Sequence, residues 1–377
     1  MSRERIKILH ISKVTGIAGS ENHLLTLLPR LNRSRYEVTF MILTEPDKPV
    51  DDYFQMFEEK GIKNKRLIIR RDVDPKCLWD MYLFIRKNRF DIVHTHLIHA
   101  DLYGTLAAKL AGVKFVLSTK HGYDSYKNIS RFYRLNQIFS PFVQKIITIS
   151  EALKEHCSKV EGISKEKMIT IYYALKDNYV NNSELKNYIR DQLKLREDIF
   201  LIAIAGRLIE VKGHKYLFEA LVHVKKKFND FRLLVIGDGI LRGELENISL
   251  ALNLNEYTIF LGYRKDIQSI LPGIDLLVHP SLGEGFGLVI LEAMAQAKPV
   301  ISTNITSIPE IVMNNETGLL VPPADSKLLA ESIIKLIENR ELANKLGLAG
   351  KERLKRFFTV EKMVKETEKL YESLLHS

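Results

Sequence analysis

The sequence of 377 residues lacks several features that would restrict its class. No apolar run approaches the roughly 18 residues that a helix needs to cross a bilayer, which argues against a transmembrane protein. Cysteine occurs only at Cys77 and Cys157, so a disulfide framework is implausible and a reducing cytosol is the expected location. The sequence shows no internal repeat and no low-complexity tract. The start, MSRERIKILHIS, is charged and then briefly apolar, which favours a first strand over a signal peptide.

The composition is that of a soluble globular protein, with 46% hydrophobic and 27% charged residues. The length exceeds what one ordinary core fills, so two domains are expected. The net charge of +10 is uneven: residues 1–185 carry 30 Lys and Arg against 21 Asp and Glu, whereas residues 186–377 carry 26 against 25. The basic first half favours attraction to an anionic membrane surface or a phosphate-bearing acceptor. Nucleic-acid binding and an ordinary lysine-rich surface are the alternatives.

Strand-like and helix-like runs alternate along both halves of the chain, which predicts βαβ units and parallel sheets. Residues 174–198 interrupt the alternation, because they are polar and contain no strand-like run, and they predict a linker with a short helix. The final run, VEKMVKETEKLYESLL, has apolar residues at helical spacing and predicts an amphipathic helix. The predicted strands are residues 6–12, 36–43, 91–96, 114–121, 145–150, 199–206, 231–237, 257–262, 275–281, 299–303 and 318–323.

The stretch HPSLGEGFGLVILEAMAQAKPV, residues 279–300, joins a predicted strand to a predicted helix through three glycines, Gly283, Gly285 and Gly287. In open α/β sheets, ligands bind at the carboxyl ends of the strands. Glycine lets the backbone approach a ligand closely, and a helix beginning near Leu288 carries partial positive charge at its start. The loop and helix start therefore predict an anion site that suits a phosphate.

Two glutamates flank this junction, Glu284 and Glu292, with seven residues between them. Carboxylates repel phosphate but accept hydrogen bonds from hydroxyl groups. Hydroxyl groups on both sides of a diphosphate describe a nucleotide sugar, with ribose at one glutamate and a hexose at the other. In the alternative interpretation, Glu284 is simply exposed and Glu292 pairs locally. Arg207 and Lys212, in IAGRLIEVKGH, directly follow a predicted strand and would oppose the diphosphate, unless they are ordinary surface cations.

Two glycine-rich loops are weaker candidates. Gly237 begins the loop VIGDGILRGELE, where Arg242 breaks the G-x-G-x-x-G spacing, so a dehydrogenase is disfavoured. The same turn can still line a base or ribose pocket. Gly19 lies in GIAGSEN, a strand-to-helix loop that could hold a phosphate or an acceptor.

Histidines gather at two strand ends in the first half. His94 and His96 alternate on one predicted strand, with His99 nearby, so a metal is conceivable, but no matching carboxylate or cysteine lies close in sequence. His121 ends the next predicted strand, where it could contact a hexose or its departing phosphate. The alternative is a hydrogen-bonded structural histidine.

Together these residues resemble the retaining glycosyltransferases of the GT4 family, which have the GT-B fold. Glu284 and Glu292 match the family's E-x7-E motif. The segments AGRLIEVKG, GDGILRGELE, FLGYRKDI, EGFGLVILEAMAQAKPVIST and TGLLVPPAD match in order across about residues 200–325, and GIAGSENHLLTLLPRL, VHTHLIHADLYG, STKHG and ITISEALKEH match more loosely.

The resemblance implies an α/β protein of two Rossmann-like domains that face a cleft. Residues 1–180 would form the acceptor-side domain, with a terminal helix of residues 359–377 packed back on it, and residues 181–358 would bind the nucleotide sugar. It implies a UDP- or GDP-sugar donor, a glycan or lipid-linked acceptor, no cofactor, no metal and no nucleic-acid partner. We expect a cytoplasmic protein that can lie peripherally on the inner face of the membrane.

The same resemblance implies roles for individual residues. Arg207 and Lys212 would hold the diphosphate, and Glu292 the ribose. Glu284 would hold the sugar, with the backbone amides of Phe286–Leu288, and His121 would lie beside the anomeric centre. Catalytic roles are thus expected for His121, Glu284, Arg207 and Lys212. Donor contacts are expected for Gly19, Arg207, Lys212, Gly237, Glu284, Gly285, Phe286, Gly287, Leu288 and Glu292.

Two pairs of residues depart from the family pattern. Tyr173 and Ala174 replace its usual Asn-Gly, and Thr306 and Ser307 stand where it has a small pair with glycine. Neither departure is expected to touch the charged residues. The resemblance therefore implies a retaining, metal-independent glycosyltransferase. A sugar-nucleotide epimerase of similar fold and a basic membrane or nucleic-acid binding module are the rivals.

Overall fold

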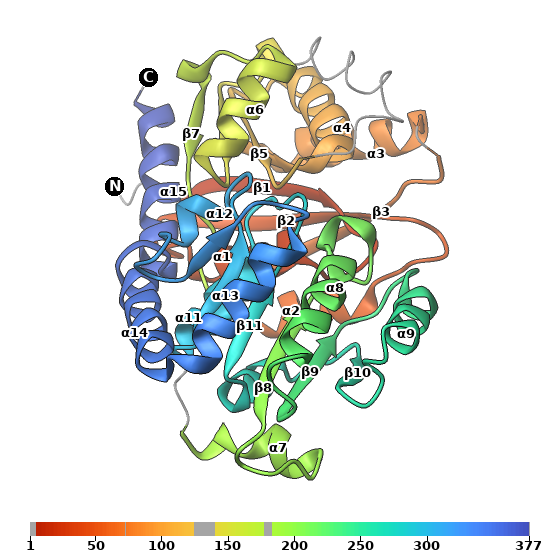
Figure 1. Ribbon diagram of the computed structural model, residues 1–377. Helices are drawn as coiled ribbons and strands as arrows, with labels where there is room; N and C mark the ends of the chain where they lie inside the picture. The colour runs from red at the N-terminus through yellow and green to blue at the C-terminus, as the bar shows by residue number, and fades with distance from the viewer. Residues whose placement is uncertain (1–4, 72, 124–139, 177–182, 377) are drawn as a thin grey trace. The chain divides into compact units, whose positions relative to one another are not determined.

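The computed structural model describes residues 5–71, 73–123, 140–176 and 183–376 (Figure 1). Its contacts divide the chain into two compact units, the first comprising Met1–Ala174 and Val360–Ser377 and the second Leu175–Thr359. The expected domain boundary between residues 180 and 181 lies outside the described residues. Among these residues, no helix has the length and apolar character that a membrane span requires.

The first unit is built on a parallel sheet with the strand order β3-β2-β1-β4-β5-β6-β7. Its strands are β1 (Ile6–Lys13), β2 (Tyr36–Thr44), β3 (Lys63–Ile68), β4 (Ile92–His96), β5 (Phe115–Lys120), β6 (Lys145–Thr148) and β7 (Met168–Thr170). Its helices are α1 (Gly19–Leu27), α2 (Asp51–Glu59), α3 (Pro75–Asn88), α4 (Leu97–Leu110), α6 (Glu151–Glu161) and α15 (Val360–Leu375).

The terminal helix α15, dark blue in Figure 1, belongs to this first unit although it ends the chain. Its apolar stripe, which includes Met363, Leu370 and Leu374, is buried in the same core as residues of α1, α2, β1 and β2. The predicted amphipathic helix is thus confirmed, and its buried face is one side of the helix, as its apolar spacing requires.

The second unit repeats the architecture with the strand order β10-β9-β8-β11-β12-β13, again parallel throughout. Its strands are β8 (Phe200–Ala205), β9 (Phe231–Ile236), β10 (Thr258–Gly262), β11 (Leu276–His279), β12 (Val300–Thr303) and β13 (Leu319–Val321). Its helices are α7 (Tyr188–Gln192), α8 (His214–Lys225), α9 (Arg242–Ala251), α10 (Ile267–Ile270), α11 (Leu288–Ala295), α12 (Ile308–Ile311), α13 (Ser326–Glu338) and α14 (Arg340–Phe357).

Most strands of the two units are largely apolar, because helices cover both faces of the sheet, whereas the edge strand β3 has few apolar residues. All six residues of β8 are buried, for example, and α8 packs beside α13 over the second sheet. The predicted pair of parallel α/β units is therefore confirmed. Each sheet also has a point where the strand order reverses, between β1 and β4 in the first unit and between β8 and β11 in the second. Such switch points open a crevice at the carboxyl ends of the strands, where ligands of these folds bind.

Candidate active site

The switch point of the second unit joins the loop after β8 to the loop after β11. The Leu282 amide donates a hydrogen bond of 2.7 Å to the Val211 carbonyl. A Cβ on Gly213 would lie 2.0 Å from the carbonyl oxygen of Pro280, and Gly213 has a positive φ of 69°. Only glycine fits such a close backbone approach without strain, so the glycine of VKGH holds the two loops together.

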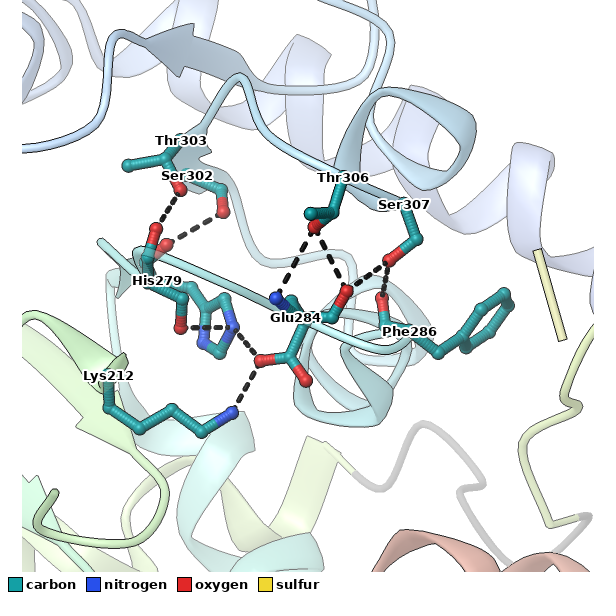
Figure 2. A network of polar contacts seen from close by, with 9 residues as sticks. Lys212, His279, Glu284, Phe286, Ser302, Thr303, Thr306 and Ser307 are labelled. Carbon is teal, nitrogen blue, oxygen red and sulfur yellow. Dashed lines mark hydrogen bonds and ion pairs between the residues drawn. The ribbon is translucent and has the colours of Figure 1, made fainter. Parts of the chain in front are cut away.

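A charged cluster lies at this junction, as Figure 2 shows. Lys212 reaches Glu284 from the β8 loop, with 2.5 Å between Nζ and Oε2. His279, the last residue of β11, places Nε2 2.9 Å from the same oxygen. Because a carboxylate only accepts hydrogen bonds, Nε2 of His279 must carry the hydrogen. The cluster brings together two residues that the sequence assigned to a donor site, and it adds His279, which sequence reasoning missed although it begins the same motif.

The environment keeps Glu284 ionised. Burial raises the pKa of this carboxyl group, but the hydrogen bond and charge of His279 and the charge of Lys212 outweigh it and lower the pKa to about 2. Its side chain is 13% exposed, and Oε1 has no hydrogen-bond partner among the described residues. Glu284 can therefore accept a hydrogen bond from a ligand hydroxyl while Lys212 and His279 hold its other oxygen.

Thr306 and Ser307 fix the backbone of the same loop. The Thr306 hydroxyl donates to the Glu284 carbonyl (2.9 Å) and accepts from the Glu284 amide (3.3 Å), and Ser307 Oγ donates to the Glu284 carbonyl (3.1 Å) (Figure 2). The departure at Thr306 and Ser307 therefore does contact Glu284, against the expectation, but through its backbone and not through its carboxylate. Thr306 also has a positive φ of 45°, an unusual conformation for a β-branched residue, and such strain concentrates at functional sites.

Helix α11 begins at Leu288, as the sequence predicts, with Gly287 as its N-cap at a φ of 101°. The first amides of a helix have no partner within it, so those of Leu288 and Val289 can face an anion. Phe286 anchors the loop, because its side chain is 2% exposed and its ring lies 5.9 Å from that of Phe358. Glu292 is half-buried at the fifth position of α11, where it has contacts within the protein.

Arg207 and Gly237 lie on the neighbouring strand ends. Arg207 follows β8 and is exposed, with no side-chain partner among the described residues. Gly237 follows β9 with a positive φ of 136°, and a Cβ there would lie 1.9 Å from the Gly206 carbonyl oxygen. The carboxyl edge of the second sheet therefore carries Arg207, Lys212, Gly237, Glu284, Gly285, Phe286, Gly287, Leu288 and Glu292.

The remaining predicted site residues, Gly19 and His121, belong to the first unit. Gly19 is the first residue of α1, where the Ala18 amide and Ser20 Oγ donate to Glu21 Oε2 at 3.0 and 2.9 Å. A carboxylate of the protein thus lies at the start of α1. His121 follows β5, and both of its ring nitrogens are occupied, Nε2 by His96 (2.9 Å) and Nδ1 by the hydroxyl of Tyr173.

His121 ends a buried series of hydrogen-bonded rings at the switch point of the first sheet. His96 continues to His10 (3.0 Å), His10 to the hydroxyl of Tyr371 (3.2 Å), and that hydroxyl to His94 (2.8 Å). Burial lowers the pKa of His10 to about 3, and it also holds the pKa values of His94 and His96 well below the ordinary range. These imidazoles are therefore neutral, and each nitrogen of a neutral ring acts as either donor or acceptor.

The same cluster contains the histidines that suggested a metal in the sequence. Ring nitrogens of His10, His94 and His96 lie within 4.8 Å of one another. His10 and His96 are bonded to each other and His94 is bonded to Thr119 (2.7 Å), so a cation would have to replace these hydrogen bonds. No carboxylate joins the cluster among the residues that the structure describes.

Two parallel α/β units, each with a switch point, define the GT-B class of fold, and the second unit adds a charged cluster beside a helix start. The match to family models is consistent with this class. Residues 186–353 match the model of glycosyl transferases group 1, and residues 17–176 match that of glycosyltransferase family 4.

Relatives and solved structures cover most of the chain. The capsular polysaccharide biosynthesis glycosyltransferase CapM of Staphylococcus aureus is 31% identical over 81% of this chain and 84% of its own. The UDP-Gal:alpha-D-GlcNAc-diphosphoundecaprenol alpha-1,3-galactosyltransferase of Escherichia coli is 27% identical over 98% and 97%. The crystal structure of HepE from Anabaena in complex with UDP superimposes with a TM-score of 0.86 at 22% identity, covering 98% of this chain and all of HepE.

The chain therefore belongs to the group 1, GT4-type family of glycosyltransferases, and it has the GT-B fold. It is an enzyme, a hexosyltransferase of the GT4 type.

Proposed function

We propose that the enzyme transfers a hexosyl group from a UDP- or GDP-sugar to a hydroxyl group of a glycan or lipid-linked acceptor, with retention of configuration and without a metal. The observation that carries the proposal is the charged cluster at the β8–β11 switch point. There a helix start, a lysine and an ionised glutamate converge, and one oxygen of that glutamate has no hydrogen-bond partner among the described residues. Among relatives, CapM is named for capsular polysaccharide biosynthesis, and the E. coli enzyme for a lipid-diphosphate-linked sugar acceptor.

The residues divide the donor between them. The start of α11 and the cations Arg207 and Lys212 stabilise the charge that develops on the leaving diphosphate. Glu284 accepts hydrogen bonds from the sugar hydroxyls through Oε1, and Glu292 does so from the ribose. Gly237 lets the β9 loop approach the nucleotide. The second unit is in this proposal the donor domain, and the first unit is the acceptor domain.

The chemical step follows from retention in the absence of an obvious covalent nucleophile. The bond between the anomeric carbon and the diphosphate oxygen breaks while the acceptor oxygen attacks from the same face of the sugar. The departing phosphate oxygen takes the proton of the acceptor hydroxyl, so atoms and charge balance without a further base. We place His121 beside the anomeric centre. Because both ring nitrogens of His121 are occupied within the protein, its ring would contribute shape and polarity more than proton transfer.

A thermal-shift screen of nucleotide sugars identifies the donor, because a ligand that binds only the folded state raises the unfolding midpoint. Incubation of the labelled donor with and without acceptor then separates transfer from epimerisation. NMR of the product reads its anomeric configuration, and a chelator tests the independence from metal. A labelled donor that is isomerised without acceptor would overturn the transferase assignment.

Glu292→Ala is expected to lose most donor binding while it folds normally, because the ribose loses its hydrogen-bond acceptor. Calorimetry with the donor from the screen measures the loss, and Glu331→Ala, at an exposed position of α13, is a matched control. Equal donor affinity in both variants would remove Glu292 from the site.

A further inference from the structure

Helix α3 of the first unit exposes apolar side chains that no other described element covers. Trp79 is 59% exposed and Leu83 is 46% exposed, and they lie one helical turn apart on the same face. The opposite face is buried through Cys77, Met81 and Ile85, where α3 packs against α4 (Figure 1). Trp79 is the only tryptophan in the sequence.

Cations flank the apolar pair at both ends of the helix. Lys76 lies about one turn before Trp79, and Arg86 and Lys87 lie about one turn after Leu83, all three exposed. The helix has a single acidic side chain, Asp80, which is paired with Lys76 at 2.8 Å. We call Lys76, Trp79, Leu83, Arg86 and Lys87 the α3 surface.

A hollow adjoins the carboxyl end of the α3 surface. It has a volume of about 440 Å³, and both polar and apolar side chains line it, with Phe90 and Phe115 among the apolar ones. Arg86, Arg89 and Lys114 also line it. Among the described residues that line it, Asp91 is the one with a carboxylate, and it accepts a hydrogen bond of 2.8 Å from the Lys7 amide. The hollow can therefore receive an anionic group, with three cations nearby to oppose its charge.

We propose that the α3 surface docks this enzyme on a bilayer rich in anionic phospholipid. The helix lies parallel to the membrane plane, with Trp79 and Leu83 at the boundary between headgroups and acyl chains. Lys76, Arg86 and Lys87 extend their charged ends to lipid phosphates, and the hollow holds one further headgroup. An apolar stripe that contains tryptophan and is bordered by cations is the pattern of helices that lie in the membrane interface.

The charges favour a lipid surface over a second copy of the chain. A two-fold contact through the α3 surface would bring cations of one copy toward cations of the other, since basic side chains flank the apolar pair at both ends of the helix. Anionic phospholipids instead complement every unpaired charge of the surface. The membrane contact itself is argued independently of the proposed function. Only its use to the enzyme rests on that function, because a lipid-linked acceptor would be presented at the bilayer.

Trp79 reports its own surroundings, since it is the sole tryptophan. The full-length protein is mixed with vesicles of phosphatidylcholine alone, or of phosphatidylcholine with phosphatidylglycerol, in the absence of donor and acceptor. We expect a blue shift of the Trp79 emission and protection from acrylamide quenching only with the anionic vesicles, and both should weaken as salt rises.

Matched charge reversals locate the contact. Arg86→Glu with Lys87→Glu should lower vesicle binding by more than about tenfold. Lys226→Glu with Lys335→Glu, at exposed positions of the second unit, changes the net charge equally and should leave binding intact. If the two pairs of substitutions lowered vesicle binding equally, binding would depend on net charge alone and the proposal would be overturned.

Three further results would also overturn it: no binding to anionic vesicles, binding without a change in Trp79 emission, or a blue shift that accompanies self-association without vesicles. Donor binding by calorimetry is measured on the same preparations. If vesicle binding fails while donor binding persists, the membrane surface is refuted and the proposed transferase function stands.

Discussion

The two units share a parallel α/β architecture but fill their switch points with opposite chemistry. In the first unit, His10, His94 and His96 are fully buried and neutral at the β1–β4 junction. In the second, Lys212 and Glu284 form an ion pair at the β8–β11 junction, and the other carboxylate oxygen has no partner in the part of the chain that the structure describes. The fold thus supplies the same crevice position twice, and the side chains decide what each can bind.

Backbone packing differs between the units as well. Gly213 after β8 touches the Pro280 carbonyl, whereas Gly16, in the loop after β1, would place a Cβ with no atom within 4 Å. The loop after β8 therefore packs tightly against the loop after β11 beside the ion pair. The loop after β1 has no such close contact at Gly16.

The largest expected effect on stability comes from disrupting the close contact between Gly213 and the Pro280 carbonyl. Gly213→Ala should destabilise the protein by more than about 3 kcal/mol, because its Cβ would meet a backbone oxygen at a positive φ. Gly16→Ala, the matched change in the first unit, should stay within about 0.5 kcal/mol. Urea denaturation of both variants measures the difference. Similar stability in the two would show that the β8–β11 contact is not close.

The next largest effect is a difference in how the stability of the two units falls at acidic pH. The folded pKa values of His10, His23, His94 and His96 lie below the ordinary value of 6.5, so below that pH the unfolded chain binds protons that the folded unit excludes. Each such histidine removes about 1.4 kcal/mol of stability per pH unit as the pH falls toward its folded pKa. In the second unit, His214, with a pKa lowered by burial to about 4, contributes in the same way.

The stability that the ionised Glu284 contributes is lost only at lower pH, below the ordinary glutamate value of 4.5. We therefore expect the first unit to lose stability more steeply than the second as the pH falls from 6.5 to 4.5, the ordinary pKa values of histidine and glutamate. Hydrogen exchange, corrected for its intrinsic pH dependence, should show peptides of β1 and β4 losing protection before those of β8 and β11. Loss of protection in both units at one pH would contradict the neutral state of the buried histidines.

A smaller effect is expected from the hydroxyl of Tyr371. Tyr371→Phe leaves a nitrogen of His94 and one of His10 without their partner in a buried site, at a cost of about 1 to 3 kcal/mol. Tyr263→Phe, which removes a hydroxyl from a side chain 67% exposed in the second unit, should have no measurable effect on the urea midpoint. If Tyr371→Phe matches this control, the ring series does not stabilise the first unit.

Much of the fold could be predicted from local patterns. The predicted strands 231–237 and 299–303 correspond to β9 and β12 within a residue, because buried parallel strands are continuous apolar runs. The strands β3 and β7 were missed. β3, KNKRLI, is an edge strand with few apolar residues, and β7 has only three residues.

The site was predictable where one motif contains it, as with the loop before α11 and its glutamates. The long-range contacts that position its side chains and shift their pKa values could not be predicted. Lys212 and Glu284 are 72 residues apart, and His94 and Tyr371 are 277 apart, so their pairing depends on the register of whole elements. Thr306 shows the same limit, since neither its φ nor its bonds to Glu284 follow from its sequence neighbours.

The most direct test of the donor crevice is calorimetric titration of the full-length enzyme with UDP and with GDP. We expect one of them to bind, and Lys212→Ala to weaken that binding by about tenfold or more. Lys215→Ala, which removes a 65% exposed lysine at the second residue of α8, should bind like the unaltered enzyme. If Lys212→Ala and Lys215→Ala bind the nucleotide equally well, the β8–β11 junction is not where the diphosphate lies.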